Sequence, residues 1–391
     1  MLNVQTYLLT HSLGELASDH GVYARFSTKN PNKFTLNYDQ LEARDNDPIS
    51  QECRGLVLRA ENPLGNPQTA PVGETRVMAF PMRRFFNYGQ GAAAEVDFSD
   101  PRCRFLSKED GTLCIMYWDR DIMSWCVGTR SVPDADLPMD GFGEQTFADL
   151  FWKAFKASGG DLSSLGYAKG NYTFCFELCT PDNQIVVKYP DYKVFLLAVR
   201  GLELGFSEDM PDVWAEQIRV PVVPSYRFGS TEEMLDFVQK LNGTQNEGIV
   251  VCDTKFNRVK VKNAGYLALS KVKDSVTKSP RSIMEVILHG QEDDVLPLCS
   301  QHVQDFILNT KEGLRKALLA LDEEFSREYV SDRKAFALAI QAGSGEMGPQ
   351  MARWSGKCGS AREWINVNKK EGGWPASFLD KLLSMAKNVL S

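Results

Sequence analysis

The sequence lacks several features that mark common classes of protein. It has no apolar run of transmembrane length, and its N-terminus has neither the basic region nor the small-residue cleavage site of a secretory signal. Its four histidines are scattered without H-E-x-x-H spacing, and its nine cysteines form no C-x-x-C pair. We therefore expect a cytoplasmic protein with no membrane partner, no zinc site and no histidine-based hydrolytic centre.

Two familiar nucleotide-binding motifs are also missing. No G-x-x-x-x-G-K-[ST] sequence occurs, which excludes a P-loop. The segment GQGAAA at 89–94 fits G-x-G-x-x-A, but it follows RRFFNY rather than a buried strand, so a Rossmann site is not indicated. A nucleotide-binding function would need another device.

Charge and composition set broad limits on partners. The chain has 391 residues, of which 43% are hydrophobic and 24% charged, as in a globular protein of two or three domains. Its net charge of −7 argues against a protein that coats nucleic acid nonspecifically, because such binding needs many cationic contacts to phosphates. Basic residues do gather at 82–86 and 257–273, where either a local basic cleft or a strand with one wet face fits the pattern.

The hydrophobic period changes along the chain. From about residue 20 to 265 the apolar runs, QIVVKY among them, are short, β-rich and separated by turns, whereas from about 280 the period is helical. Helical inserts are expected at 143–158 and at 230–243, the latter opened by a capping box between Ser230 and Glu233.

These patterns predict an α+β fold with two domains. The first, over residues 1–270, is mainly antiparallel β with helical inserts. The second, over residues 271–391, is all-α.

The segment FLSKEDGTLCIMYWD at 105–119 has two interpretations. Asp110-Gly111 is a strong two-residue turn signal between strand-like flanks, which indicates a β-hairpin with Lys108 as a solvated neighbour of the turn. In the second interpretation Lys108 has a chemical role, and this depends on three later segments, each on a predicted strand or strand end. In order, these are FEL at 176–178, NEGIVV at 246–251 and KVK at 260–262.

This ordered series resembles the covalent nucleotidyltransferase superfamily of ATP-dependent ligases and capping enzymes, whose nucleophile motif is K-x-D-G. Within it, about residues 30 to 270 look like the bacteriophage RNA ligase 1 family. The segments that carry this resemblance are LNYDQ, ECRGLVL, PMRRFFN, SKEDGTL, PDNQIVVKY and VKVKNAGY. The resemblance implies an ATP-grasp-like nucleotidyltransferase domain and makes Lys108 the nucleophile.

The implied chemistry gives the lysines distinct roles. Lys108 would attack the α-phosphorus of ATP and form lysyl-AMP, a case of covalent catalysis. A free lysine, with a pKa near ~10.4, is protonated at neutral pH, so nearby cations must favour the neutral amine. Lys260 and Lys262 are two apart on one predicted strand and face the same side. They would depress the pKa of Lys108 and stabilise charge on the transferring phosphoryl group.

The other site residues follow from their match to the family motifs. Glu247 suggests a magnesium role, directly or through water, and the resemblance gives Glu177 a ribose hydroxyl as partner. Asp110 would orient Lys108 or bind metal, or else is a plain turn residue. Tyr266 matches an aromatic after the last motif, or else is a packing residue. The residues that match contacts to the ATP phosphates are Tyr38, Arg54 and Arg84, with Arg83 beside the last.

The resemblance implies an ATP-dependent ligase that joins 5′-phosphate and 3′-hydroxyl ends of single-stranded RNA, with Mg²⁺ or Mn²⁺ as metal. Its implied partners are RNA ends, among them broken tRNA, and single-stranded DNA as a further substrate. We expect a monomer in the cytoplasm, that of the host for a phage-encoded protein. Three alternatives stay open: a ligase of DNA ends, a GTP-using capping enzyme, and an inactive nucleic-acid-binding module. The first two would need an OB-fold of five strands where the sequence offers helices.

Overall fold

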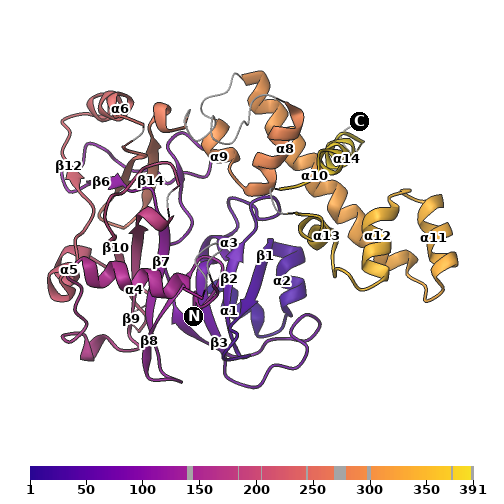
Figure 1. Cartoon of the computed structure of the whole chain (residues 1–391), viewed down its shortest axis with the longest axis horizontal. Helices are drawn as coiled ribbons and strands as arrows, with labels where there is room; N and C mark the ends of the chain where they lie inside the picture. Colours follow the sequence, from indigo (N-terminus) through magenta and orange to yellow (C-terminus); the bar gives the residue numbers. More distant parts are fainter. Residues whose placement is uncertain are drawn as a thin grey trace. The chain divides into compact units, whose positions relative to one another are not determined.

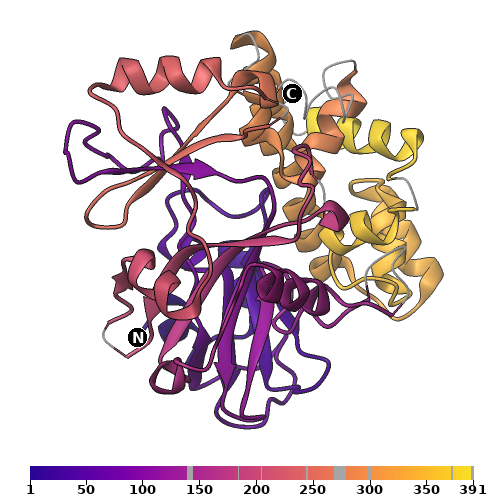
Figure 2. The ribbon, with the colours of Figure 1, turned by 60° about the vertical axis from the view of Figure 1, so that its left-hand side comes forward.

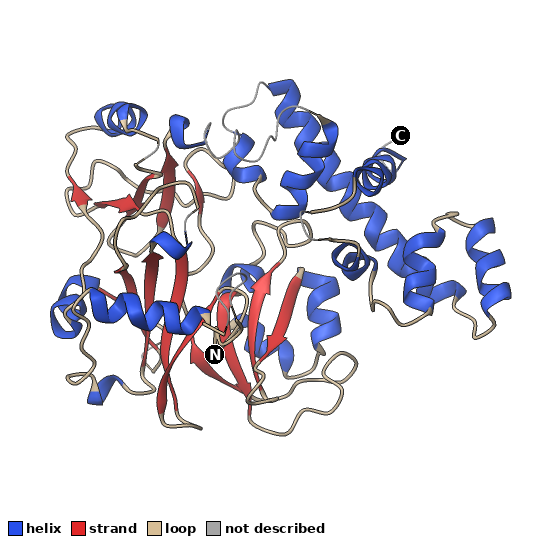
Figure 3. Cartoon of the chain, viewed as in Figure 1, coloured by secondary structure: helices blue, strands red, loops and turns tan. Residues whose placement is uncertain are grey.

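The chain folds as two compact units, Met1–Ser270 and Lys271–Ser391 (Figure 1). The computed structural model describes residues 1–138, 144–183, 185–203, 205–243, 245–267, 279–296, 301–370 and 373–388. Within these described ranges, all strands lie in the first unit and the second unit has helices, as Figure 3 shows by colour. The predicted class, antiparallel sheets followed by helices, is confirmed. The predicted boundary at residue 270 lies outside the described residues.

The first sheet is antiparallel and buries one face against N-terminal helices. Its strands follow the order β1-β2-β3-β4. The strands are β1 (Val22–Phe26), β2 (Lys33–Tyr38), β3 (Arg54–Ala60) and β4 (Thr75–Ala79), and the helices are α1 (Asn3–Leu8), α2 (Leu13–His20) and α3 (Pro48–Glu52). Leu8, Leu16, Phe34 and Leu56 are fully buried in one hydrophobic cluster between these elements.

The second sheet packs one face on the first sheet and the other on helices α4 (Phe147–Ala157) and α5 (Pro211–Ile218). Its order is β11-β10-β9-β7-β8. The strands are β7 (Thr112–Asp119), β8 (Ser124–Thr129), β9 (Tyr172–Cys179), β10 (Lys193–Gly201) and β11 (Glu208–Asp209). Cys175 and Cys179 on β9 are both buried.

The third sheet carries the nucleophile candidate. Its order is β12-β6-β13-β14-β5, and helix α6 (Thr231–Lys240), the salmon helix at the upper left of Figure 2, covers its apolar face. The strands are β5 (Phe86–Asn87), β6 (Arg104–Lys108), β12 (Ser225–Tyr226), β13 (Gly248–Cys252) and β14 (Arg258–Lys262). Strand β6 pairs with β12 and β13, and both of these strands lie more than 100 residues later in the sequence.

The hairpin interpretation of residues 105–119 is wrong. Strand β6 belongs to the third sheet and β7 to the second, so the chain passes from one sheet to the other at Glu109–Gly111. Each flank finds its partners elsewhere: Lys108 pairs with Gly248, and Thr112 pairs with Leu178.

Two other sequence expectations need correction. The run QIVVKY does not form a strand in residues 185–189, because the Val186 and Val187 N–H groups donate to a carboxylate of Asp110 instead of a neighbouring strand. Its first residue, 184, lies outside the described residues, as does residue 143 of the first predicted helix. The predicted capping box of α6 is half formed: Ser230 Oγ accepts from the Glu233 N–H, but the Glu233 carboxylate accepts from the Gly229 N–H.

The second unit is built around one long helix, α10 (Gln301–Glu328), against which α14 (Ala376–Asn388) packs. The remaining helices are α8 (Pro280–His289), α9 (Glu292–Val295), α11 (Arg333–Ala342), α12 (Met347–Trp354) and α13 (Ala361–Val367). Buried Leu318, Leu321, Leu382 and Leu383 supply apolar side chains to α10 and α14. Across the described part of the chain, no helix has both the length and the apolar composition needed to cross a membrane.

The aromatic cluster between β9 and α4 should dominate the stability of the first unit. The Phe176 ring is fully buried, with ring centroids of Phe151 and Phe155 at 5.4 and 6.0 Å. Phe176→Ala is expected to lower the free energy of unfolding by about 3 to 5 kcal/mol, because it leaves a cavity. Val213→Ala on α5, where the side chain is 59% exposed, should change it by less than about 0.5 kcal/mol. Urea denaturation followed by tryptophan fluorescence measures both, and equal midpoints would contradict this account.

Candidate active site

Three neighbouring strands place two lysines on either side of a glycine. Gly248 on β13 is in register with Lys108 on β6 and with Lys262 on β14. Residues in one cross-strand row face the same side of a sheet, so Lys108 and Lys262 face one another across Gly248. A Cβ atom at Gly248, whose φ is +145°, would lie 2.2 Å from the Val261 carbonyl oxygen. Glycine is therefore required where the two strands approach most closely.

Glu247 connects the two lysines. Glu247 as a whole residue is 4% exposed. Its Oε2 lies 2.5 Å from Lys108 Nζ, and its Oε1 lies 3.0 Å from Lys262 Nζ. Burial acts to raise the pKa of Glu247, but Lys108 and Lys262 outweigh burial and hold that pKa below its ordinary value. Both oxygens are thus engaged by ammonium groups. A metal ion bound by Glu247 would take the place of one of them.

Glu177 enters the site from the second sheet. Its Oε1 accepts the Gly111 N–H at 3.0 Å, which ties β9 to the segment that follows Lys108. Burial raises the pKa of Glu177 to about 7; Lys108 and Arg54 act to lower this pKa and Glu247 to raise it. Glu177 therefore lies within electrostatic reach of Lys108, Glu247 and Arg54, which brings these predicted residues together.

Tyr38 and Arg54 of the first sheet lie in a group of arginines that also includes Arg84, before β5, and Arg130, after β8. The Arg84 guanidinium carbon lies 4.4 Å from the Tyr38 ring centroid, and that of Arg130 lies 5.1 Å from it. Burial lowers the pKa of Arg54, and the nearby Arg130 charge lowers it further. Among the described residues, no group accepts a hydrogen bond from the buried atoms Arg54 Nη1, Arg84 Nη1 and Arg130 Nε. Buried donors without partners are costly, so the cluster is suited to an anion.

Arg130 is a residue that the sequence analysis missed. It follows β8 directly, and an arginine at a strand end has no distinguishing pattern in the sequence. Its proximity to Arg54 depends on the packing of the first sheet against the second, which only the folded chain reveals.

Lys260 lies two residues before Lys262 on β14, and both side chains face the same side of the sheet. Its ammonium is 5.5 Å from the Phe85 ring centroid, and the Arg54 guanidinium carbon is 5.4 Å from that same centroid. The Phe85 ring therefore has Lys260 of the third sheet and Arg54 of the first sheet near it.

Asp110 and Tyr266 contact one another in a buried position. The Tyr266 hydroxyl donates to Asp110 Oδ1 at 2.8 Å, while the Val186 and Val187 N–H groups each donate to Asp110 Oδ2 at 2.7 Å. Asp110 is 2% exposed. Its carboxylate therefore holds the loop after β9 and the segment after β14 against the residues that follow Lys108.

The sequence of the first unit matches a family model. That model is described as RNA ligase and matches residues 52–266, which is more than half of the chain. The chain belongs to the RNA ligase family. The resemblance to RNA ligases drawn from the motif order is thereby confirmed.

Individual relatives of this RNA ligase are distant. An RNA ligase of Rhodothermus phage RM378 is 22% identical over 333 residues, which cover 71% of this chain and 72% of that protein. Among solved structures, an archaeal ATP-dependent RNA ligase has a TM-score of 0.43 at 15% identity and covers 84% of both chains. A mutant of the Naegleria gruberi RNA ligase with ATP and Mn has a TM-score of 0.35 at 15% identity and covers 44% of this chain and 52% of that chain.

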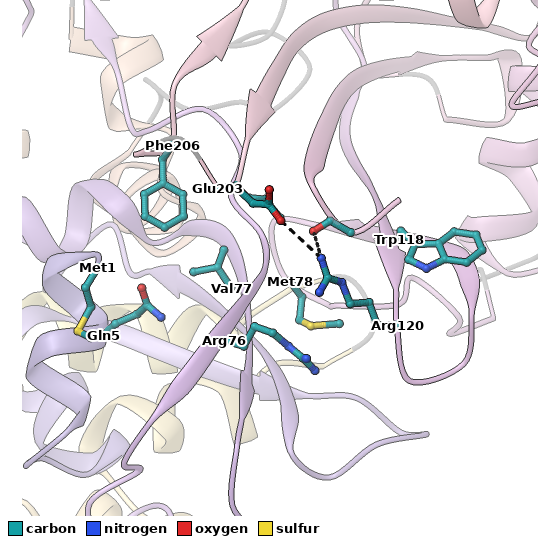
Figure 4. A pocket seen from close by; sticks show the side chains of 11 residues that line it. Met1, Gln5, Arg76, Val77, Met78, Trp118, Arg120, Glu203 and Phe206 are labelled. Carbon is teal, nitrogen blue, oxygen red and sulfur yellow. Dashed lines mark hydrogen bonds and ion pairs between the residues drawn. The ribbon is translucent and has the colours of Figure 1, made fainter. Parts of the chain in front are cut away.

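Two cavities of the RNA ligase differ in their relation to these residues. One, of about 610 Å³, has Arg84 and Phe85 in its lining and adjoins the arginine group. The other, of about 400 Å³, is drawn in Figure 4; there Arg120 points toward Glu203, and Arg76, Met78 and Trp118 lie nearby. The described lining residues of this second cavity include none of the predicted site residues.

The raised pKa of Glu177 predicts how stability depends on pH. Because the folded-state pKa is about 7 instead of 4.5, the folded protein binds more protons than the unfolded protein between these values. Stability from this group is therefore complete below pH 4.5 and is lost as the pH rises through 7. Glu177→Gln removes this titration. As the pH rises from 4.5 to 8, the free energy of unfolding of the variant should therefore increase by about 1 to 3 kcal/mol relative to that of the parent. Denaturant unfolding from pH 4.5 to 8 measures this difference.

Glu74→Gln, which replaces an exposed carboxylate, is the matched control and should follow the parent protein at every pH. Parallel stability curves for the parent and Glu177→Gln would show that Glu177 is not held in a desolvated position.

Proposed function

We propose that this RNA ligase is ATP-dependent and seals 5′-phosphate to 3′-hydroxyl ends of single-stranded RNA through a lysyl-AMP on Lys108. The observation that carries the proposal is the convergence of Lys108 with Lys262 and Glu247, next to buried arginine donors that lack partners. Lys108 Nζ attacks the α-phosphorus of ATP and pyrophosphate leaves. AMP then passes to the RNA 5′-phosphate, and attack by the 3′-hydroxyl releases AMP.

In this proposal, Glu247 holds Lys108 in an ion pair that must open before the lysine reacts. An ammonium that donates to Glu247 Oε2 has no free electron pair, so attack requires loss of a proton and separation from the carboxylate. Lys262 remains beside Glu247 and supplies positive charge next to the reacting phosphate. Lys260 extends that charge along β14. Preorganised cations at a developing charge are among the larger sources of catalysis.

The arginine group fits the phosphates of ATP. Arg54, Arg84 and Arg130 each present one buried nitrogen atom without a hydrogen-bond partner among the described residues, and the last two lie against the Tyr38 ring. Guanidinium groups bind phosphate oxygens in forked pairs, which would satisfy these donors. We assign Arg130 to this group together with Tyr38, Arg54 and Arg84. Arg83 is 54% exposed in its side chain and is the less enclosed alternative to Arg84.

Three further residues have proposed roles. Glu177 would accept a ribose hydroxyl, because its buried carboxylate lies within electrostatic reach of Lys108 and Arg54. Asp110 and Tyr266 position the residues after Lys108 through their mutual hydrogen bond. Glu247 is the ligand proposed for Mg²⁺ or Mn²⁺, whose oxygen preference suits a carboxylate and which would neutralise phosphate charge.

We assign residues 1–270 to adenylyl transfer, because every residue with a proposed role in ATP chemistry lies there. Residues 271–391 form a helical domain that bears on which RNA is bound. Broken tRNA is the proposed physiological substrate, with single-stranded DNA as a further one. The proposed form is a cytoplasmic monomer.

The nucleophile can be tested with α-labelled ATP and magnesium. The parent protein should acquire a label that acid releases and hydroxide leaves in place, as expected of a phosphoramidate. Lys108→Ala should abolish it. Lys108→Arg should abolish it too, because arginine keeps the charge beside Glu247 but stays protonated. Lys193→Ala, at a half-exposed lysine on β10, is the control and should label normally. Full labelling of Lys108→Ala would falsify the assignment.

The lysine row can be tested by the rate of label incorporation. Lys260→Ala and Lys262→Ala should each slow adenylylation by about 10²- to 10³-fold, the effect of removing one preorganised donor from a developing charge. Lys240→Ala, at an exposed position on α6, should leave the rate unchanged. Rates within about twofold of the parent for both β14 variants would leave these lysines as a solvated strand face.

A further inference from the structure

The basic face of β14 continues past the proposed catalytic lysines. Arg258, Lys260 and Lys262 occupy alternate positions and share one face, while Val259 and Val261 lie in the apolar core beneath α6. Successive members of such a row are about 6.6 Å apart. The row therefore leads from the Lys108 position, in register with Lys262 through Gly248, to Arg258 in the lining of the 610 Å³ cavity.

The lining of this cavity is strongly basic. Arg83, Arg200, Lys255 and Arg258 contribute to it, and Glu208 is the acidic member among the described lining residues. Glu208 is shared, since both Arg258 and Arg200 pair with its carboxylate. Arg200 Nε and Arg84 Nη1 are buried without a hydrogen-bond partner among the described residues. From outside the described lining, Asp45 pairs with Arg84 and Glu52 lies 3.5 Å from Arg83. Lys255 and the two unsatisfied donors remain available in the lining, which suits an anionic ligand.

Aromatic side chains form another part of the lining. Phe85 directly precedes β5 and Phe86 begins it, while Phe256 comes from the turn between β13 and β14. That turn is well fixed, because Asp253 Oδ1 accepts the N–H groups of Lys255 and Asn257 at 2.8 Å each. Phe256 has a φ of +62°, a left-handed conformation that bulky residues rarely adopt. The turn therefore holds Phe256 at the cavity beside the exposed Lys255.

We propose that this cavity holds a nucleotide of the RNA strand whose end is joined, with its phosphate on the cationic side chains and its base against Phe256. The inference deepens the function proposed above and rests on it. Cationic grooves with aromatic platforms are the general means of binding single-stranded nucleic acid. The leaving pyrophosphate is the other anion that could occupy such a site, but pyrophosphate needs no aromatic surface and is small for a space of this size. The combination of charge, rings and volume favours the nucleotide.

The test separates RNA binding from ATP chemistry in the full-length protein. Affinity for a fluorescent 5′-phosphorylated RNA 12-mer is measured without ATP, and Lys108 adenylylation is measured without RNA. Phe256→Leu and Lys255→Glu should each weaken RNA binding by about tenfold while changing adenylylation by less than about twofold. Phe256→Tyr keeps the ring and should bind as the parent does. Lys156→Glu makes the same charge change on α4. Lys156 is exposed and is not among the described lining residues of this cavity, so this variant should also bind RNA normally.

Several outcomes would overturn the inference. Parent-like RNA affinity in both Phe256→Leu and Lys255→Glu would show that the cavity does not hold RNA. Slowed adenylylation with unchanged RNA affinity would assign the cavity to pyrophosphate. Thermal melting shows whether Phe256→Leu is folded. If it is not, the RNA affinity of Lys255→Glu, a change at an exposed position, decides the question. Since RNA affinity needs no ATP, failure of the parent protein to label Lys108 would overturn the proposed adenylylation and still leave the cavity decided by the RNA measurement.

Discussion

The carboxylate of Glu247 is the group around which the candidate site is built. A buried carboxylate is unstable without positive partners, and here Lys108 and Lys262 supply them from the two strands that flank β13. The same contacts fix the position of the nucleophile candidate before any substrate arrives. Gly248, next in sequence, lets the three strands approach closely enough for this arrangement. One ion-paired carboxylate therefore links strand register, lysine position and the charge state of the site.

The second requirement is that three sheets meet at this point. Lys108 ends β6 in the third sheet, Glu177 comes from β9 in the second, and Arg54 begins β3 in the first. The residues after Lys108 are tied to this junction by the Gly111–Glu177 and Asp110–Tyr266 hydrogen bonds. Side chains held by several rigid elements keep a defined geometry, which the proposed adenylyl transfer requires.

Much of the fold could be predicted from sequence, since short apolar runs bounded by turns indicate strands such as β7, β9 and β13 whatever they pair with. Sheet membership could not, because the pairing of Lys108 with Gly248 depends on tertiary contacts that a local Asp-Gly turn signal does not record. QIVVKY has the composition of a strand, yet Asp110 takes the N–H groups that a strand would use. Motif order singled out Lys108, Lys262 and Glu247, which the structure brings together, whereas Arg130 has no sequence signature.

The passage of the chain between sheets at Glu109–Gly111 also determines where its length can vary. One residue added there would carry Lys108 out of the row with Gly248, or move Gly111 away from Glu177, so no compensating shift within a single sheet restores both. The turn between β7 and β8 differs, because Ile122 and Met123 at its tip are 58% and 69% exposed and join strands of the same sheet. Insertions and deletions accumulated during divergence should therefore gather at turns of this second kind, while the four-residue segment that begins at Lys108 keeps a constant length.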